Sequence, residues 1–476
     1  MFQQVRKAVR TGALAFSVSV LAVASASAET LSDAMVSAYR HSGLLEQNRA
    51  LLRAADEDVA ATLALLRPVL NWFGEIRHTS SNARNAGSVG RVVSNDRQYA
   101  SIGLEFQLLL FDNGATRLAV DAAKETVLAT RQALVSVEQA VLFDAVQAFM
   151  SVVRDTEIVL LRQNNLRVLE RELQAARDRF EVGEVTRTDV ALAEARLEGA
   201  RAQLAAAQGD LLQSQEFYAS AIGHRPGKLT APTRLPYTAK SVDDAKAVAI
   251  RSHPEMIRAQ HEISAAELNV LRTKAQMGPT VSLGARYGTE QEFGNNFFSD
   301  GASVGVTLGG PIYQGGRLSA LSRQAMARRD AVRAGLHVTR HGIREAAGSS
   351  WARLIASGAA ITSSERQVDA ARIAFEGVRE EAKLGARTTL DVLTAEQDLL
   401  DAEANLITAM ATQHIAAYAV LSSMGLLTID HLNLRVEQYD PEAYYNLVKD
   451  APAVHSKRGK QLDKVLKSLG KAADHN

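Results

Sequence analysis

RFEVGEVTRTDVALAEARL, at residues 179–197, has a counterpart further along the same chain, EAKLGARTTLDVLTAEQDL at 381–399. Each copy lies between two long alanine-rich segments with helical periodicity. A glycine can end one helix in the left-handed conformation, and a threonine or aspartate can cap the next. The repeated stretch therefore predicts two helical hairpins, each closed by a tight turn. A constant offset of 202 residues aligns Gly183 with Gly385, Thr186 with Thr388, Asp189 with Asp391, and Glu194 with Glu396.

The composition excludes several classes of function. The 476 residues carry a formal net charge of +1, so no strong positive field would recruit nucleic acid. There is no cysteine, which excludes disulfides, thiolate metal sites, cysteine nucleophiles and a lipid anchor on an N-terminal cysteine. Aromatic residues make up only 5%, a low share that suits long helices packed through alanine.

We expect neither an enzyme nor a cofactor. The sequence contains no phosphate-binding glycine loop, no nucleophile elbow and no recognisable catalytic triad. His337 and His341 are four residues apart, as zinc ligands can be, but no Glu follows His337 and nothing nearby supplies a third ligand. We therefore expect no metal site.

The first 28 residues have the pattern of a cleaved export signal. Three basic residues precede an apolar stretch at 13–23, and the sequence Ala-Ser-Ala at 26–28 fits a cleavage site between small residues. The apolar stretch is too short to span a bilayer, and we expect no later stretch to do so. The sequence thus predicts that the mature chain leaves the cytoplasm without a transmembrane helix.

The mature part reads as two copies of one unit. Near its start the offset between copies is 211, which aligns Asp33 with Asp244 and Pro68 with Pro279. Further on the offset is 202, so the first copy has a longer loop in between, where exposed insertions are tolerated. We divide the chain into a signal peptide, a first repeat, a linker, a second repeat and an equatorial or disordered tail, at 1–28, 29–223, 224–240, 241–428 and 429–476.

Each copy contains two stretches with the alternation of a half-buried strand. In the clearest, Ile102, Leu104, Phe106 and Leu108 alternate with small or polar residues. Such lengths, near ten residues, cross a bilayer when the strand is tilted. A small soluble sheet over a helical core is the alternative, but these strands form isolated pairs within a helical chain. The expected strands are at about 68–78, 98–110, 279–289 and 302–312.

A helix of unusual length follows each strand pair, at about 115–180 and 317–382. At a rise of 1.5 Å per residue such a helix is roughly 100 Å long. The return helices are about half as long, so two shorter helices must stack end to end beside each long one. These are the return helices and the first helical segment of each copy, at 188–221, 388–423, 30–66 and 243–277.

Further expectations concern the helical segments and the tail. The second copy should be interrupted at His253-Pro254, because a residue before proline avoids the helical conformation. The basic tail could contact a membrane or an acidic partner, or remain solvated and disordered. The two hairpins span 115–221 and 317–423, with tips at 180–189 and 382–391. Coiled-coil-like seams should form along Leu192, Leu197, Leu204, Leu211 and Leu212, and along Leu393, Leu399, Leu400 and Leu406.

Four amphipathic strands cannot close a barrel in a membrane, because hydrocarbon does not tolerate open sheet edges. The chain must therefore pool its strands with copies of itself. A dimer would give eight strands, whose interior is filled by side chains, whereas a trimer gives twelve and room for an aqueous lumen. The sequence favours a trimeric channel.

Several short motifs, together with the repeated tips, resemble the TolC family of outer-membrane channel-tunnels. They are Leu-Phe-Asp-Asn-Gly at 110–114, Pro-Ile-Tyr-Gln-Gly-Gly at 311–316 and Asp-Val-Leu-Thr-Ala at 391–395, and the resemblance covers roughly residues 29–428. It implies a mainly α fold with membrane β-structure. A homotrimer would form a twelve-stranded β-barrel in the outer membrane of a Gram-negative bacterium, continued by a twelve-helix α-barrel in the periplasm.

The resemblance also implies a function and partners. The trimer would be the exit duct of a tripartite system, in which a periplasmic adaptor and an inner-membrane ABC or RND pump deliver the cargo. The cargo would be proteins in type I secretion or small molecules in efflux, and the missing lipid-anchor cysteine favours secretion or general export. The competing class is a periplasmic coiled-coil adaptor, which should have one hairpin between β-modules rather than two hairpins alternating with strand pairs.

Roles at the tips follow from the same resemblance. Asp391 matches a gate aspartate, Arg387 its partner, and Asp189, beside Thr188, the facing acidic position of the first tip. A second gate aspartate of the family is replaced by Thr394, so we expect one ring of carboxylates at the constriction. The turns that would dock the adaptor match Val182, Gly183, Glu184, Leu384, Gly385 and Ala386. The turns between barrel and helices contain Gly114, Gly315 and Gly316.

Overall fold

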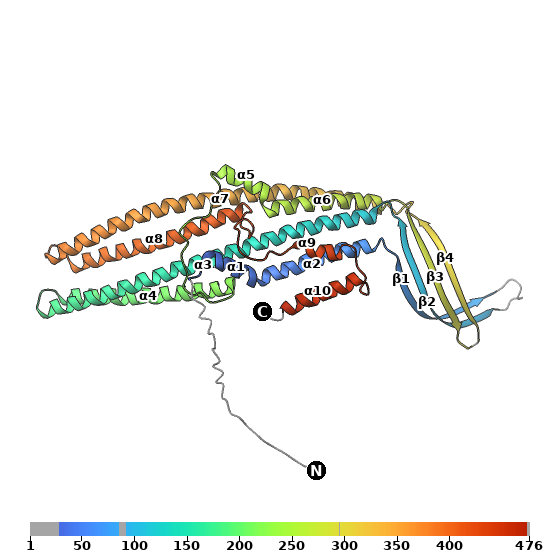
Figure 1. The fold of residues 1–476 in the computed structure, drawn as a ribbon, viewed down its shortest axis with the longest axis horizontal. Coiled ribbons are helices and arrows are strands. Elements are labelled where there is room, and N and C mark those ends of the chain that lie inside the picture. Colours follow the sequence, from blue (N-terminus) through green and yellow to red (C-terminus); the bar gives the residue numbers. More distant parts are fainter. Residues whose placement is uncertain (1–27, 85–91, 295, 474–476) are drawn as a thin grey trace, which may run out of the picture.

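The computed structural model describes residues 28–84, 92–294 and 296–473. The predicted signal, except for its last residue, lies outside this range, as does the middle of the first strand loop. In chain order the two repeats have the same series of elements, two short helices, two strands and two long helices (Figure 1). The first repeat consists of α1 Leu31–His41, α2 Gly43–Ala64, β1 Val69–Ala83, β2 Val93–Phe111, α3 Ala115–Glu181 and α4 Arg187–Ile222.

The second repeat and the tail complete the fold. The second repeat consists of α5 Val242–Ser252, α6 Pro254–Ala275, β3 Thr280–Glu292, β4 Phe298–Gly309, α7 Arg317–Lys383 and α8 Thr389–Ser423. The tail contains α9 Pro441–Val448 and α10 Lys457–Ala473.

The short helices break at equivalent positions in the two repeats. The predicted break at His253 is present: its amide donates to the Ala249 carbonyl, and its Nδ1 accepts from the Glu255 amide. The sequence prediction of one continuous segment over 30–66 is wrong, because Ser42 divides it. Its amide closes α1 on Ala38, and its hydroxyl accepts from the Leu45 amide at 3.3 Å to begin α2.

The strands form a single antiparallel sheet in the order β1-β2-β3-β4. The sequence predicts two isolated strand pairs, and this prediction is wrong. In the structure β2 of the first repeat pairs directly with β3 of the second. In the first repeat the strands are also longer than predicted, extending to Ala83 in β1 and from Val93 in β2. Figure 1 shows the sheet projecting beyond the ends of the helices, so no helical layer covers it.

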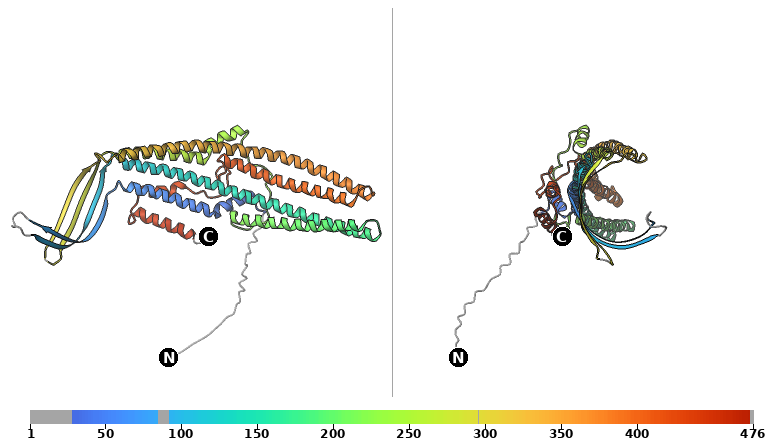
Figure 2. Two further views of the ribbon diagram at one scale, coloured as in Figure 1. Left: turned by 180° about the vertical axis from the view of Figure 1, so that it is seen from behind. Right: turned by 90° about the vertical axis from the view of Figure 1, so that its right-hand side faces the viewer.

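Each long helix has shorter helices beside it over its whole length. Helix α3 and helix α7 have 67 residues each, and α4 and α8 have 36 and 35. Contacts join α3 to α4 and α2, and α7 to α8 and α6, so the short helix and the return helix lie along successive parts of each long one (Figure 2). Leu197, Leu393 and Leu400 are buried as expected, but Leu212 is 63% exposed.

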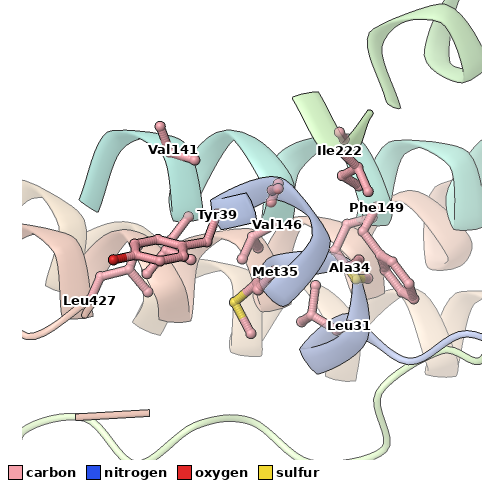
Figure 3. Packing of buried hydrophobic residues seen from close by; sticks show 14 of the residues in the cluster. Leu31, Ala34, Met35, Tyr39, Val141, Val146, Phe149, Ile222 and Leu427 are labelled. Atoms are coloured by element: carbon pink, nitrogen blue, oxygen red, sulfur yellow. The ribbon is translucent and has the colours of Figure 1, made fainter. Parts of the chain in front are cut away.

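The largest buried cluster lies at mid-length, where the chain is thickest. It joins α1, the middle of α3, the end of α4 and the end of α8. Figure 3 shows side chains of α1 and α3 meeting in this cluster, among them Met35, Val146 and Phe149. Alanines such as Ala34 and Ala145 are fully buried and let the helices approach closely, which explains why few aromatics suffice.

The C-terminal tail, as far as Ala473, packs against the first repeat. The Tyr444 hydroxyl of α9 donates to Glu57 on α2 at 2.7 Å, and Arg67 donates to the Ala451 carbonyl at 2.8 Å. Leu462 of α10 forms a small buried cluster with Tyr444 and Val448 of α9. The tail therefore forms an outer layer over α2.

One helix in the described part of the chain is long enough and apolar enough to cross a membrane. The sequence-based expectation that no stretch after the signal could do so is therefore wrong. The helix is α3, whose most apolar 18-residue window has a mean hydropathy of 1.4. Within the chain, 44% of that window is buried, and α3 contacts α1, α2, α4, α6 and α8. We attribute its apolar character to packing among these helices.

Phe149→Ala tests the central cluster. Removing this fully buried ring should cost about 3–5 kcal/mol of stability, since it leaves a cavity in a closely packed region. We expect the midpoint of thermal unfolding, followed by circular dichroism, to fall by several degrees. Phe180→Ala is the control, because Phe180 is 45% exposed, and it should leave the midpoint nearly unchanged. Equal midpoints for the two variants would contradict this assignment of the core.

Candidate functional site at the helix tips

The first tip is a short turn that reverses the chain between α3 and α4. Gly183 has a φ of +79°, the left-handed conformation that a glycine adopts without strain. The Gly183 amide donates to the Phe180 carbonyl, and the Glu184 amide donates to the Arg179 carbonyl at 2.9 Å. These bonds satisfy the last carbonyls of α3 and fix where the helix ends.

A capping box begins the return helix of this tip. The Thr186 hydroxyl accepts from the Asp189 amide at 3.3 Å, and the Asp189 carboxylate accepts from the Thr186 amide at 2.9 Å. The Thr186 hydroxyl also donates to the carboxylate, and with the amide it holds the pKa of Asp189 below its usual value. Thr188 is exposed in the first turn of α4. The threonine that bonds Asp189 is Thr186.

The second tip repeats this geometry. Gly385 has a φ of +78°, and the Ala386 amide donates to the Glu381 carbonyl. The Thr388 hydroxyl accepts from the Asp391 amide, and the carboxylate accepts from the Thr388 amide at 2.9 Å and from its hydroxyl at 2.8 Å. The two tips are therefore equivalent in backbone structure as well as in sequence.

Arg387 lies beside the second capping box but is bonded elsewhere. Its Nε donates to Glu381 at 2.8 Å, across the turn of the same tip. The backbone and hydroxyl bonds from Thr388 lower the pKa of Asp391, and the charge of Arg387 adds to this effect. Within one subunit, then, Arg387 acts on Asp391 through its charge, and its bonded partner is Glu381.

The residues expected to dock an adaptor occupy the outermost positions of both turns. Val182 is 71% exposed and Leu384 is 86% exposed, which is unusual for aliphatic side chains. Glu184 in the first turn is replaced by Ala386 in the second, so the two surfaces differ in charge. Each tip thus offers an apolar side chain on a rigid turn.

The two hairpins touch each other just behind the tips. Leu393 of α8 is buried in a cluster with leucines and alanines of α3 and α4, including Leu173 and Leu197. Glu396, one turn further along α8, is 8% exposed and also faces this contact. Glu396 is not among the site residues that the sequence predicts, although its spacing of three and four residues from Leu393 and Leu400 places it on the same helical face.

Turns with left-handed residues also join the sheet to the long helices. Gly114 has a φ of +82° and Gly316 a φ of +83°, each immediately before its helix, and Gly315 has a φ of +58°. In the first repeat the Asp112 carboxylate accepts from the amides of Gly114 and Thr116, at 3.0 and 2.7 Å. These bonds fix the first turn of α3 at the edge of the sheet.

Within residues 28–84, 92–294 and 296–473, no group of three or more His, Cys, Asp or Glu side chains is placed to hold a metal ion. The tips instead combine exposed apolar residues, capped helix ends and a few charges. Such an arrangement suits contact with another protein more than catalysis.

Comparison with known proteins agrees with this geometry. The family described as outer membrane efflux protein matches twice, at residues 35–224 and 247–426, so each repeat matches separately. The chain belongs to this family. Its two matches contain the two helical hairpins, which makes both hairpins part of the family's common structure.

Similar proteins are found over most of the chain. The outer membrane efflux protein BepC of Brucella suis is 36% identical over 93% of this chain and 96% of its own length. The outer membrane protein TolC of Vibrio cholerae is 22% identical over 69% and 77% of the two chains. The solved structure of the Vibrio cholerae outer membrane protein VceC superimposes with a TM-score of 0.69 and 21% identity, covering 83% of this chain and 96% of VceC.

These relatives establish the type of protein. As a member of the outer membrane efflux family, the chain is an outer-membrane protein that forms an exit duct for export. The family is one of channels and not of enzymes. The resemblance to TolC channel-tunnels is confirmed, and the competing adaptor class is not supported.

Thr388→Ala tests the second capping box. Loss of the hydroxyl removes the cap from the first turn of α8, so amide hydrogen exchange there should become roughly fivefold faster. Mass spectrometry of hydrogen exchange over residues 386–394 measures this. Thr394→Ala is the control, because its hydroxyl only donates back to the Leu390 carbonyl within the helix. Similar exchange in both variants would show that the cap does not hold the tip.

Proposed function

We propose that three copies of this chain form a continuous duct, with a twelve-stranded β-barrel in the outer membrane and a twelve-helix α-barrel below it. The observation that carries the proposal is the open four-stranded sheet, with β1 and β4 at its edges, continuing directly into the long helices. Unpaired edges are not tolerated in hydrocarbon, so the edges must pair between copies.

The two faces of the sheet support its position in a membrane. The strand register aligns Leu104 with Trp72 on one side and Tyr287 on the other, and these side chains are largely exposed in the single chain. The next row on the opposite face aligns Glu105 with Asn71 and Arg286. An apolar face toward lipid and a polar face toward a lumen are the pattern of membrane barrels.

We propose that the tips are the periplasmic end of the duct, where an adaptor binds and the channel closes. The rigid turns with exposed Val182 and Leu384 support an adaptor contact. Asp391, with Arg387 nearby, and Asp189 of the facing tip supply charges for links between neighbouring hairpins. In this proposal Arg387 gives up its bond with Glu381 and instead contacts a neighbouring hairpin when the tips are closed.

Both classes of cargo have relatives among the similar proteins. The alkaline protease secretion protein AprF of Pseudomonas aeruginosa is 26% identical over 64% of this chain and 66% of its own. BepC is named an efflux protein. We infer that an inner-membrane ABC or RND pump selects the cargo, since relatives named for efflux and for protease secretion both match most of this chain.

Native mass spectrometry of the detergent-extracted protein tests the assembly. The mature chain should be observed as a trimer, because twelve strands are needed for an open lumen. Its mass should be about three times that of the mature monomer. A dimer of stable mass would contradict the duct, because eight strands leave no aqueous channel.

Single-channel recording in planar bilayers tests the gate. Wild type should show discrete openings that divalent cations block from the periplasmic side. Asp391→Ala removes the expected ring of carboxylates, so we expect this block to weaken roughly tenfold. Asp398→Ala, an exposed change two turns further along α8, should behave as wild type.

The possible outcomes separate the two parts of the proposal. Openings with unchanged cation block in Asp391→Ala would retain the channel and remove Asp391 from its constriction. A folded sample without any openings would contradict the duct itself.

A further inference from the structure

Glu396 is a buried carboxyl group near the periplasmic end of the molecule. It lies on α8 between Leu393 and Leu400, which are 3% and 5% exposed, and is itself 8% exposed. Its Oε2 atom is buried and has no hydrogen-bond partner among the described residues. A buried polar atom without a partner normally costs free energy, so its position calls for a physical explanation.

The equivalent residue of the first hairpin has a different environment. Glu194 aligns with Glu396 at the repeat offset of 202 residues. Its side chain is about half exposed and accepts a hydrogen bond from Arg177 at 2.6 Å. Both repeats thus have a glutamate at the same distance from the capped turn. Only the second one, Glu396, is buried against the other hairpin.

A second carboxyl group, that of Glu172 on α3, lies near Glu396. Glu172 and Glu396 line one cavity of about 420 Å³ between α3, α7 and α8. Burial and, secondarily, the charge of Glu172 raise the pKa of Glu396 to about 7. Removal from water and a nearby negative charge both disfavour the ionised form, so Glu396 retains its proton to a higher pH than an exposed glutamate.

The other charged groups that line this cavity have contacts of their own, and the Arg171 Nε donates to the Arg167 carbonyl at 3.2 Å. Arg171 of α3 and Arg379 of α7 line it, and the Arg379 guanidinium lies over the Phe375 ring, 5.6 Å from the centroid. Glu403 of α8 also lines it and is bonded to Arg372 at 3.0 Å. Helix α4 contributes apolar residues to the adjoining cluster and no residue to the cavity lining.

We propose that Glu396 and Glu172 form a proton-dependent clasp between the two helical hairpins, which holds the tips together while Glu396 is protonated and releases them when it ionises. A protonated Glu396 can donate its O–H to the Glu172 carboxylate across the contact. Ionised Glu396 would place a buried negative charge beside the half-buried Glu172, which favours separation of α8 from α3. The inference rests on the proposed function, since the clasp controls opening of the same tips.

The direction of the pH dependence follows from the raised pKa. In a separated, hydrated hairpin Glu396 would titrate near its ordinary value of 4.5, and in the clasp near 7. The clasp is therefore at full strength below pH 4.5 and is lost as pH rises through about 7. Neutral and mildly alkaline surroundings should loosen the tips.

Planar-bilayer recording of wild type and Glu396→Gln between pH 5.5 and 8.5 tests the clasp. Open probability of wild type should rise by roughly 30-fold over this range, because the balance between clasped and separated hairpins changes about tenfold per pH unit between pH 5.5 and about 7. Glu396→Gln cannot ionise, so its open probability should remain near the low-pH value. Glu172→Gln should reduce the response, and Glu194→Gln, the matched control in the first hairpin, should retain it in full.

A distance measurement tests the clasp independently of conduction. The chain has no cysteine, so Asp178→Cys on α3 and Thr394→Cys on α8 can carry nitroxide labels without further changes. The separation of the labels, measured by pulsed electron paramagnetic resonance, should increase from pH 5.5 to 8.5, and adding Glu396→Gln should abolish the increase. Failure to conduct in any variant would count against the duct, while the label distances would still decide on the clasp.

Two results would overturn the proposal. One is a label separation that does not change with pH in the otherwise wild-type chain. The other is a pH response in Glu396→Gln equal to that of wild type, which would place the titrating group elsewhere.

Discussion

A sheet that ends in unpaired strands cannot remain open in hydrocarbon, and the rest of this structure depends on that constraint. The part of the chain that the structure describes supplies a four-stranded sheet, joined across the two repeats by the pairing of β2 with β3. Neither repeat alone closes its sheet, and in the proposed trimer the remaining edges would pair between copies. The helices inherit this geometry, because short turns join them to the sheet: α3 begins at Ala115 after β2 ends at Phe111, and α7 begins at Arg317 after β4 ends at Gly309.

Much of the fold was predictable because its signals are periodic and repeated. The capped tips, the long helices and the alternating strands each follow from local residue patterns at a fixed offset. The break at Ser42 was missed because a serine that closes one helix and begins the next carries no signal as strong as the proline after His253. Leu212 was assigned to a seam although adjacent Leu211 and Leu212 cannot both face one partner helix.

The site was less predictable, because it depends on the contact between the two helical hairpins. The sequence predicts the capped aspartates, but the bond from Arg387 to Glu381 depends on side-chain reach across a turn. Glu396 looked like one member of an equivalent pair. Only the contact between α3 and α8 distinguishes it from Glu194, which has the same local sequence position and a charged partner. Residue roles that arise from contacts between repeats cannot be read from either repeat alone.

The unbroken length of α3 and α7 has a mechanical consequence. A 67-residue helix is roughly 100 Å long, so a tilt of only about one degree at its membrane end displaces the far end by roughly 2 Å. A small tilt of the helix at the sheet would therefore be amplified at its far end. In the proposed duct, such a displacement would change the aperture at the tips while the strand pairing at the other end of the molecule is kept.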